Sequence, residues 1–160
     1  MDYMEDQTFE NINFKKEYVD VSEYDNCNFI NCDFSNANLS DTKFIDSHFD
    51  QCNFSLAKLY NTTFLDITFK ESKLIGLNFQ DCNQLGISFK CINSILSHTS
   101  FYKMKINNML FDGCTCQETD FSECDLTDSS FVNCDLSRAQ FQHSILKNVD
   151  FTTALNYSID

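Results

Sequence analysis

Residues 27–44 read CNFINCDFSNANLSDTKF, and a large apolar residue returns there at every fifth position. These residues are Phe29, Phe34, Leu39 and Phe44. A β-strand repeats every two residues and an α-helix about every 3.6, so neither element alone explains a period of five. A strand of about three residues followed by a corner satisfies the pattern, because it buries one large side chain and then turns.

The same spacing runs through most of the chain. In steps of five from Phe9, large apolar residues stand at almost every position to Phe89, and after a register slip of two residues the pattern resumes from Leu96 to Phe151. All 17 phenylalanines fall in this slot, which we call the centre of the repeat. A smaller residue, usually Cys, Ala, Ser or Thr, stands two positions earlier, on the same face of an extended strand. Each repeat therefore directs one small and one large side chain inward.

Identities in the small slot indicate how many repeats complete one turn. Stacked residues in a solenoid resemble each other, and small-slot identities are most frequent at a separation of 20 residues, as for Cys32 with Cys52. Four repeats per turn follow, and the centres of one side then form a column of phenylalanines. This column contains Phe9, Phe29, Phe49, Phe69 and Phe89, and continues through Cys91 to Phe111, Phe131 and Phe151 if two residues are inserted after Phe89.

The register slip lies between Gln84 and Leu96, where the polar Gln84 occupies a centre and Gly86 follows. We expect a local bulge or a small loop on the wall at this point. Loops that project from a regular scaffold are frequent sites of partner contact, so this stretch is a candidate for function as well as a simple insertion.

Several five-residue segments carry a family resemblance: CNFIN, CDFSN, ANLSD, TKFID, TDFSE, CDLTD and CDLSR. They resemble the pentapeptide-repeat family, whose motif is A(N/D)LXX with Leu or Phe at the centre, over about residues 9–151. The resemblance implies an all-β fold, a right-handed quadrilateral parallel β-helix with one coil per four repeats and about seven coils. We treat residues 1–160 as a single domain of this kind. No coil buries enough surface to be stable alone, so stability must come from stacking.

Composition excludes several classes of function. The net charge of −13 disfavours direct binding to nucleic acid or to an anionic membrane, and predicts basic partners. No apolar run approaches the length of a membrane span, and the start MDYMEDQ is acidic where a secretory signal is basic, so we expect a cytoplasmic protein. Nine cysteines, an odd number without a signal peptide, predict reduced thiols that fill inward slots.

No constellation of residues predicts catalysis or metal binding. Cys114 and Cys116 form a CxC pair without a second pair at metal-site spacing. His48, His98 and His143 lie outside the inward slots and belong to no recognised motif. A convex wall also lacks the cleft that shifts the pKa of a catalytic carboxylate. We expect no enzymatic activity, no cofactor and no bound metal.

Sorting the charged residues onto four sides predicts where a partner binds. The side centred on Phe14, Phe34 and Phe54 has a net charge of +1, and the other three sides are acidic. Two neighbouring corners gather carboxylates and flank a single side. The predicted partner-binding residues are Asp41, Asp46, Asp66, Asp81, Glu123, Asp125 and Asp128.

The family includes quinolone-resistance pentapeptide proteins, which resemble B-form DNA in size and charge and bind bacterial type II topoisomerases. The resemblance implies that this chain is a DNA mimic whose acidic wall occupies the basic DNA-binding groove of DNA gyrase or topoisomerase IV, protecting it against quinolones or topoisomerase toxins. The family's topoisomerase-protecting members resemble dimers joined through a C-terminal helix, and here the chain ends at TTALNYSID. We expect a monomer, or a weak homodimer through a terminal coil near Phe151, Ala154, Leu155 and Tyr157.

A second hypothesis stays open. The chain can be a structural or adaptor β-helix whose wall presents a site to another protein, with the acidic residues serving only solubility. Candidate contacts are then Tyr60, Tyr102 and the region near Lys90.

Overall fold

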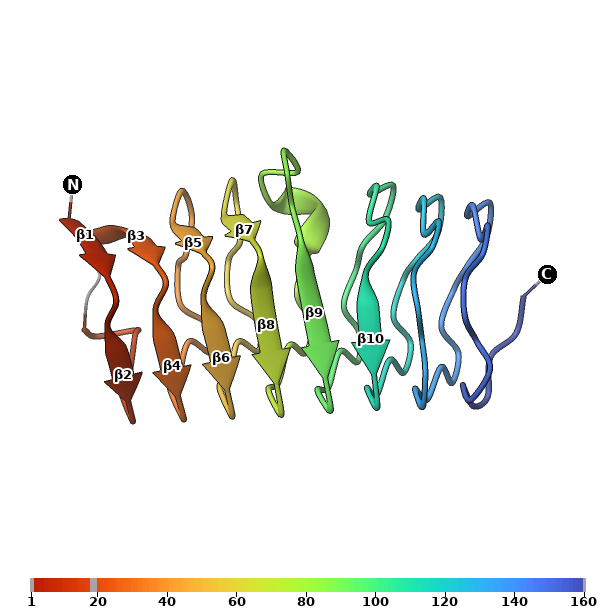
Figure 1. Cartoon of the computed structure of the whole chain (residues 1–160), viewed down its shortest axis with the longest axis horizontal. Helices are drawn as coiled ribbons and strands as arrows, with labels where there is room; N and C mark the ends of the chain where they lie inside the picture. The colour runs from red at the N-terminus through yellow and green to blue at the C-terminus, as the bar shows by residue number, and fades with distance from the viewer. Residues whose placement is uncertain (1, 18–19, 160) are drawn as a thin grey trace.

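The computed structural model of the chain describes residues 2–17 and 20–159, and Figure 1 shows them as a rod of stacked coils. The strands are short and follow each other along the chain. They are β1 (Asp2–Glu5), β2 (Thr8–Glu10), β3 (Val21–Asp25), β4 (Asn28–Ile30), β5 (Lys43–Ile45), β6 (His48–Asp50), β7 (Thr63–Leu65), β8 (Ile67–Lys70), β9 (Phe89–Ile92) and β10 (Leu110–Asp112). One 3-10 helix, η1 (Phe79–Asp81), lies between β8 and β9.

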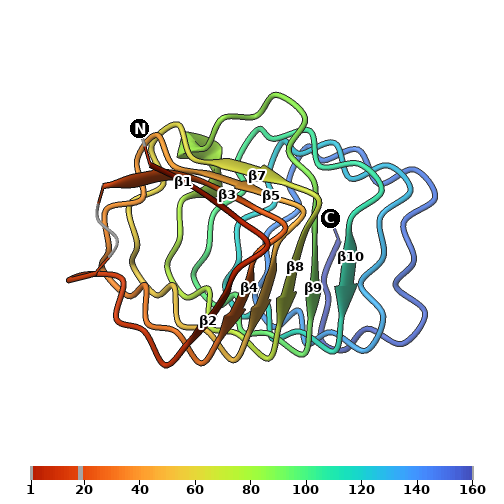
Figure 2. The same cartoon turned by 60° about the vertical axis from the view of Figure 1, so that its left-hand side comes forward.

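The strands form two parallel sheets that meet along one edge of the rod (Figure 2). One sheet has the order β1-β3-β5-β7, and the other has β2-β4-β6-β8-β9-β10. In the larger sheet each of β2, β4, β6 and β8 pairs with the strand one coil further along, so that Phe9 lies opposite Phe29 and Phe29 opposite Phe49. The predicted all-β parallel solenoid is confirmed.

Isolated bridges continue this pairing beyond the strands. The six strands of the larger sheet are joined by five pairings between successive coils, fewer than the predicted coils require. Isolated bridges extend this pairing by two further coils, from Leu110 to Ser130 and from Ser130 to Asp150. Other bridges define the two remaining sides, such as Asp33 with Asn53 and Ser100 with Asp120. Each coil therefore has four faces. We name them the β1 face, the β2 face, the Phe34 face and the Phe121 face.

The core consists of stacked aromatic columns. Phe29 and Phe49 stack with ring centroids 4.6 Å apart and planes 11° apart, and Phe111 stacks on Phe131 at 4.9 Å. Neighbouring columns meet edge to face, as for Phe49 and Phe54 at 82°. Offset-stacked and edge-to-face arrangements are the favourable geometries of aromatic pairs. Burial of the centres, which are almost all inaccessible to solvent, is the main source of stability.

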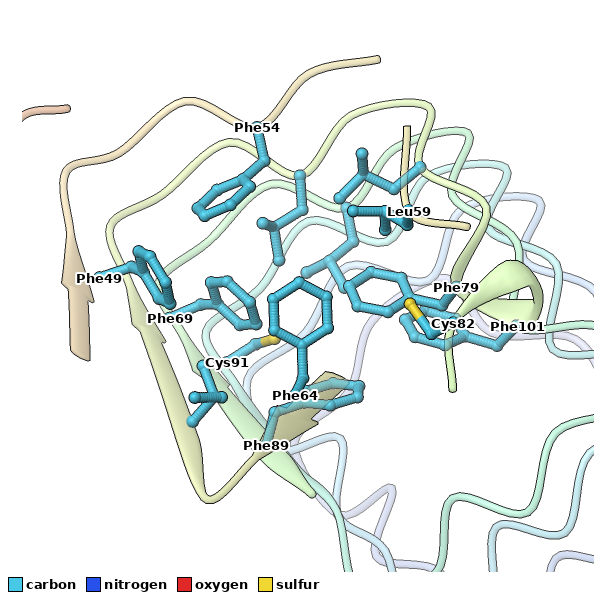
Figure 3. Close-up of a cluster of buried hydrophobic side chains, with 14 of the residues drawn as sticks. Phe49, Phe54, Leu59, Phe64, Phe69, Phe79, Cys82, Phe89, Cys91 and Phe101 are labelled. Carbon is cyan, nitrogen blue, oxygen red and sulfur yellow. The ribbon is translucent and has the colours of Figure 1, made fainter. Parts of the chain in front are cut away.

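Phe89 lies outside the predicted phenylalanine column, so that part of the prediction is wrong. Phe69 pairs with Cys91, whereas Phe89 pairs with Ile67 in the small slot. Figure 3 shows Phe89 set apart from Phe49 and Phe69, with Cys91 next to Phe69. The Phe89 ring stacks on Phe79 at 5.3 Å and meets Phe69 only at an angle of 70°. The column does continue from Cys91 to Phe111 as predicted.

Phe89 lies outside the column because the two inserted residues precede it in the chain and do not follow it. Asn83 N still donates to the Thr62 carbonyl, but Ser88 N donates to the Phe64 carbonyl, so the register changes between Asn83 and Ser88. Residues 83–88 form the expected loop on the wall, and Leu85 at its tip is 86% exposed. Gln84 does not reach the core, and the buried Phe89 ring occupies space in the coil that lost its own centre.

Most corners are formed by left-handed residues other than glycine, because the chain has only three glycines and no proline. Among the described residues, 24 non-glycine residues have positive φ, and 15 of these are Asn or Asp. Asn and Asp tolerate this region better than other residues with a side chain. The residue before a centre supports the turn as well: Asp33 Oδ1 accepts a hydrogen bond from Ser35 N at 2.9 Å, and Asp125 Oδ1 accepts one from Thr127 N at 3.1 Å. These polar side chains therefore build the corners in addition to facing water.

Acid is expected to destabilise the solenoid through these turn carboxylates. Hydrogen bonds from Thr127, from Asn156 and from Thr152 hold the pKa values of Asp125, Asp135 and Asp150, respectively, below their usual range. Because the folded pKa is depressed, the stabilisation is present above the unfolded pKa near 3.8 and is lost as pH falls through the folded value. Thermal unfolding monitored by circular dichroism should show Tm falling between about pH 5 and pH 3. The triple Asp→Asn variant at these positions should show a shallower fall; equal slopes would contradict this role.

In the described part of the chain, no helix has the length and apolar character needed to cross a membrane.

Candidate protein-binding surface

The β1 face carries more negative charge than any other face of the rod. Its described residues comprise positions 2–6, 22–26, 42–46, 62–66, 104–108, 124–128 and 144–148. The face carries nine carboxylates and three lysines. The carboxylates are Asp2, Glu5, Asp6, Glu23, Asp25, Asp46, Asp66, Asp125 and Asp128, and the lysines are Lys43, Lys105 and Lys147. Of these lysines, Lys43 is paired with Glu23 at 3.5 Å. The face is therefore the most acidic side of the rod.

The contribution of β1 to this face was missed by sequence reasoning, which began the repeats at Phe9. β1 pairs with β3 and so adds Asp2, Glu5 and Asp6 to the acidic surface. The signal was present, because the half-buried Met4 stands five residues before Phe9 and lies opposite Tyr24.

One corner of the β1 face, where it meets the β2 face, carries a ladder of polar side chains that we call the acidic corner. It consists of Asp6, Asn26, Asp46, Asp66, Ser88, Asn108, Asp128 and Asn148. Asn26 Nδ2 donates to Asp6 Oδ1 at 2.6 Å, and Asn148 Nδ2 donates to Asp128 Oδ1 at 2.9 Å. Amides thus separate most of the carboxylates along the ladder. Asp46 and Asp66 are the exception, since they occupy successive coils with no amide between them.

The opposite corner of the β1 face is partly neutralised. Asp41 Oδ1 accepts a hydrogen bond from Asn61 Nδ2 at 2.8 Å. Glu123 accepts one from the Tyr102 hydroxyl at 3.0 Å and pairs with Lys103 at 3.5 Å. Asp81 ends η1 and does not adopt the left-handed corner conformation. This corner therefore offers less uncompensated charge than the acidic corner.

Asp125 lies between the two corners and is engaged in its own turn. Its Oδ1 accepts hydrogen bonds from Thr127 N at 3.1 Å and from Thr127 Oγ1 at 2.6 Å, which lower its pKa. Asp46, Asp66 and Asp128, in contrast, are exposed corner residues. Of the seven predicted residues, the structure thus places three, Asp46, Asp66 and Asp128, at the acidic corner, and a fourth, Asp125, on the face beside it.

A groove runs beside the acidic corner and contains two of the predicted residues. It has a volume of about 860 Å³ and extends from the first coil to the sixth. Asp46 and Asp66 line it together with Glu5 and Asp6, and Lys90 of the β2 face lies on its border. Asp128 occupies the same corner beyond the groove. The groove depends on side-chain directions, so no sequence pattern could reveal it.

The negative charge of the β1 face affects the pKa of Tyr3. Loss of solvation and the charges of Glu5 and Asp25 raise the pKa of this phenol to about 12. The Tyr3 hydroxyl also donates to Asp25 Oδ2 at 3.3 Å. A neutral phenol is favoured here because its ionisation would add another negative charge to an acidic surface.

The cysteines lie in the interior of the solenoid, where hydrogen bonds with neighbouring thiols lower the pKa values of Cys32 and Cys134. All nine are buried free thiols, and burial raises the pKa values of Cys82 and Cys124 to about 12. The thiol of Cys52 donates to the Phe29 carbonyl of the preceding coil at 3.4 Å. Within the described residues, no group of three or more His, Cys, Asp or Glu side chains is arranged to hold a metal ion. Seven of these thiols fill small slots, whereas Cys91 and Cys116 occupy centres, and six of the small-slot thiols donate to carbonyl groups.

Several large apolar side chains are exposed near the middle of the rod. Tyr60 and Tyr102, two of the candidate adaptor contacts, are 69% and 37% exposed. Leu56 at 59% and Leu85 at 86% were missed, because a corner and an inserted loop lie outside the five-residue pattern of inward slots. Lys90 is exposed on β9.

Comparison with known proteins supports the family. The family model "Pentapeptide repeat region" matches residues 22–93 and 87–157. Among solved structures, full-length QnrB1, a plasmid-mediated fluoroquinolone resistance protein, is 22% identical, covering 97% of this chain and 94% of its own with a TM-score of 0.38. HetL, a pentapeptide repeat protein involved in heterocyst differentiation regulation from the cyanobacterium Nostoc, is 13% identical, covering 99% and 92% with a TM-score of 0.43. No protein with a curated description matches. The chain belongs to the pentapeptide-repeat family.

Proposed function

We propose that this protein is a non-enzymatic rod that binds other proteins through its acidic β1 face, and that its partner presents a basic groove. A type II topoisomerase, DNA gyrase or topoisomerase IV, is the first candidate, because its DNA-binding groove is built to hold a rod of negative charge. In this role the protein is a DNA mimic that works in the cytoplasm and protects the enzyme against quinolones or topoisomerase toxins. It needs no cofactor and contacts no nucleic acid itself.

The observation that carries the proposal is the excess of carboxylates on one face. Successive coils are about 4.8 Å apart. Carboxylates on the β1 face and at its two corners are therefore spaced along the rod at multiples of this distance. Duplex DNA carries one charge per about 1.7 Å of axis, so the face has a lower charge density but the same sign and a linear arrangement. The Phe34 face carries Lys15, Lys16 and Lys73 and is not acidic, which orients the rod on a basic partner.

A supercoiling assay tests the proposal. The purified protein is titrated into DNA gyrase with relaxed plasmid, with and without ciprofloxacin. We expect inhibition of supercoiling at high protein concentration and partial rescue of the quinolone-inhibited enzyme at lower concentration. Neither effect across a micromolar range, together with no binding at low salt in a direct interaction assay, would contradict the topoisomerase as partner.

A specific observation favours the adaptor as a second candidate. The exposed Leu85 lies within residues 61–106, which have a net charge of +2, and the exposed Leu56 and Tyr60 lie directly before this segment, at the end of residues 1–60, which have −8. Exposed apolar groups in a weakly charged region suit a partner that is not strongly basic. If replacement of Leu85 and Tyr60 by serine weakens partner binding while charge reversal on the β1 face does not, the adaptor role is supported.

We also propose that association through the last coil is weak. Leu155 is 61% exposed and Tyr157 is 48% exposed, and the Tyr157 ring stacks on Phe151 at 5.3 Å. Light scattering should show a monomer at low micromolar concentration, and any dimer at higher concentration should disappear in a Leu155→Glu variant with unchanged Tm. A stable dimer that this variant leaves intact would contradict a contact through this coil.

A further inference from the structure

We propose that the groove beside the acidic corner binds an extended segment of a protein partner that carries Lys or Arg residues at one end and aliphatic residues at the other. The inference rests on the proposed function, because it specifies which part of a partner the acidic side of the rod recognises. It concerns a defined groove, however, and not the face as a whole.

The dimensions of the groove suit a single extended chain. Its lining begins at Glu5 and Asp6 in the first coil and ends at Asn108 and Leu110 in the sixth. Five steps of about 4.8 Å give a length of about 24 Å. An extended segment rises about 3.3 Å per residue, so about seven residues span the groove. Its direction along the rod axis keeps the segment beside the acidic corner over its whole length.

The first part of the groove attracts positive charge. Glu5, Asp6, Asp46 and Asp66 line this part, and among the described residues none of the four forms an ion pair. Asp6 is partly satisfied by the Asn26 amide and Asp66 by the Ser88 hydroxyl, at 3.1 Å. Asp46 and Asp66 stack in successive coils and repel each other. A lysine or arginine side chain placed between them would relieve this repulsion.

The last part of the groove combines apolar side chains with the polar Asn107 and Asn108. Ile87, Phe89, Met109 and Leu110 line it. It arises because the small slot of the β2 face holds Phe89 and Met109 here, where Ser129 stands in the following coil. An aliphatic side chain that lies over these groups would bury its surface.

Lys90 fixes the direction of the bound segment. It borders the apolar part and has no ion-pair partner among the described residues. A second positive charge at this end would be repelled, whereas the carboxylates attract it at the other end. The groove therefore prefers a segment with clustered basic residues over one with the same residues at both ends.

The test uses fluorescence anisotropy of a labelled eight-residue peptide with three lysines at one end and two leucines at the other. A control peptide has the same composition with the lysines divided between both ends. The groove variants are Thr68→Trp, which fills the groove from β8, and the double variant Asp46→Asn with Asp66→Asn. Their matched controls are Thr115→Trp, at the equivalent half-exposed position of the Phe34 face, and Glu71→Gln with Glu118→Gln at other corners. Thermal melts establish that all four variants fold.

We expect the clustered peptide to bind at least tenfold more tightly than the divided one, and both groove variants to weaken it at least tenfold while both controls leave it unchanged. Equal affinity for the two peptides, or binding that Thr68→Trp does not weaken, would overturn the inference. The outcome is separable from that of the proposed function. If charge reversal abolishes gyrase binding but Thr68→Trp does not change peptide binding, the groove alone is rejected. If the peptide binds in the groove but the protein has no effect on gyrase, the topoisomerase alone is rejected.

Discussion

Replacing Phe49 with alanine is expected to lower the free energy of unfolding by about 3–5 kcal/mol, the range for large-to-small changes of buried aromatic residues. Phe49 is completely buried and stacks on Phe29 at 4.6 Å and on Phe69 at 5.3 Å. It also meets Phe54 edge to face at 4.9 Å. The cavity left by the ring would remove contacts with the coils on both sides, and the stability of a solenoid depends on such nearest-neighbour contacts.

The measurement is chemical denaturation followed by far-ultraviolet circular dichroism. Ile30→Ala is the matched control, because Ile30 lies next to Phe29 on β4 but points outward with 39% exposure. Surface substitutions of this kind stay within about 0.5 kcal/mol. Similar effects of the two substitutions would show that the phenylalanine column does not hold the coils together.

If a topoisomerase is the partner as proposed, reversing three charges of the acidic corner, in the triple variant Asp46→Lys, Asp66→Lys and Asp128→Lys, should weaken its binding strongly. Each exposed ion pair contributes up to about 1 kcal/mol, so a loss of about 2–3 kcal/mol, or roughly 30- to 150-fold in affinity, is expected. The corner accepts the change, since Lys103 and Arg138 already occupy left-handed corner positions. Binding assays at several salt concentrations should also show a weaker salt dependence for the variant.

The matched control reverses the same number of charges away from the β1 face, with Glu10→Lys, Glu71→Lys and Glu118→Lys. If net charge alone attracts the partner, both triple variants lose affinity equally, and the acidic corner is not the contact. If the β1 face is the contact, the control keeps most of its affinity.

The sequence predicted the solenoid well because a single physical rule, one large and one small inward side chain per repeat, applies to nearly every coil. The same rule explains why the register slip was misplaced. The two inward slots stand two residues apart, so an insertion of two residues exchanges them without turning any side chain outward. Phe89 fits the large-residue pattern by spacing but occupies the small slot opposite Ile67, and only the pairing of Phe69 with Cys91 reveals this.

The candidate site was predictable in part for a related reason. Corner residues recur at a fixed position of the repeat, so the stacking of Asp46 and Asp66 follows from spacing alone. Three features depend on side-chain conformations, which no periodicity encodes. They are the ion pair of Glu123 with Lys103, the hydrogen bond from Asn26 to the Asp6 carboxylate, and the groove. The acidic residues of β1 were missed because that strand precedes the first phenylalanine.

Carboxylate footprinting of the protein with and without the proposed topoisomerase partner tests most directly whether the β1 face is the binding surface. Exposed carboxylates are coupled to an amine with a carbodiimide in the free and the bound protein, and labelling is measured at each residue by mass spectrometry. Labelling of Asp46, Asp66 and Asp128 should fall on binding, while that of Glu10 and Glu71 should remain. Unchanged labelling of the acidic corner, with protection of Glu10 or Glu71 instead, would show that another face binds the partner.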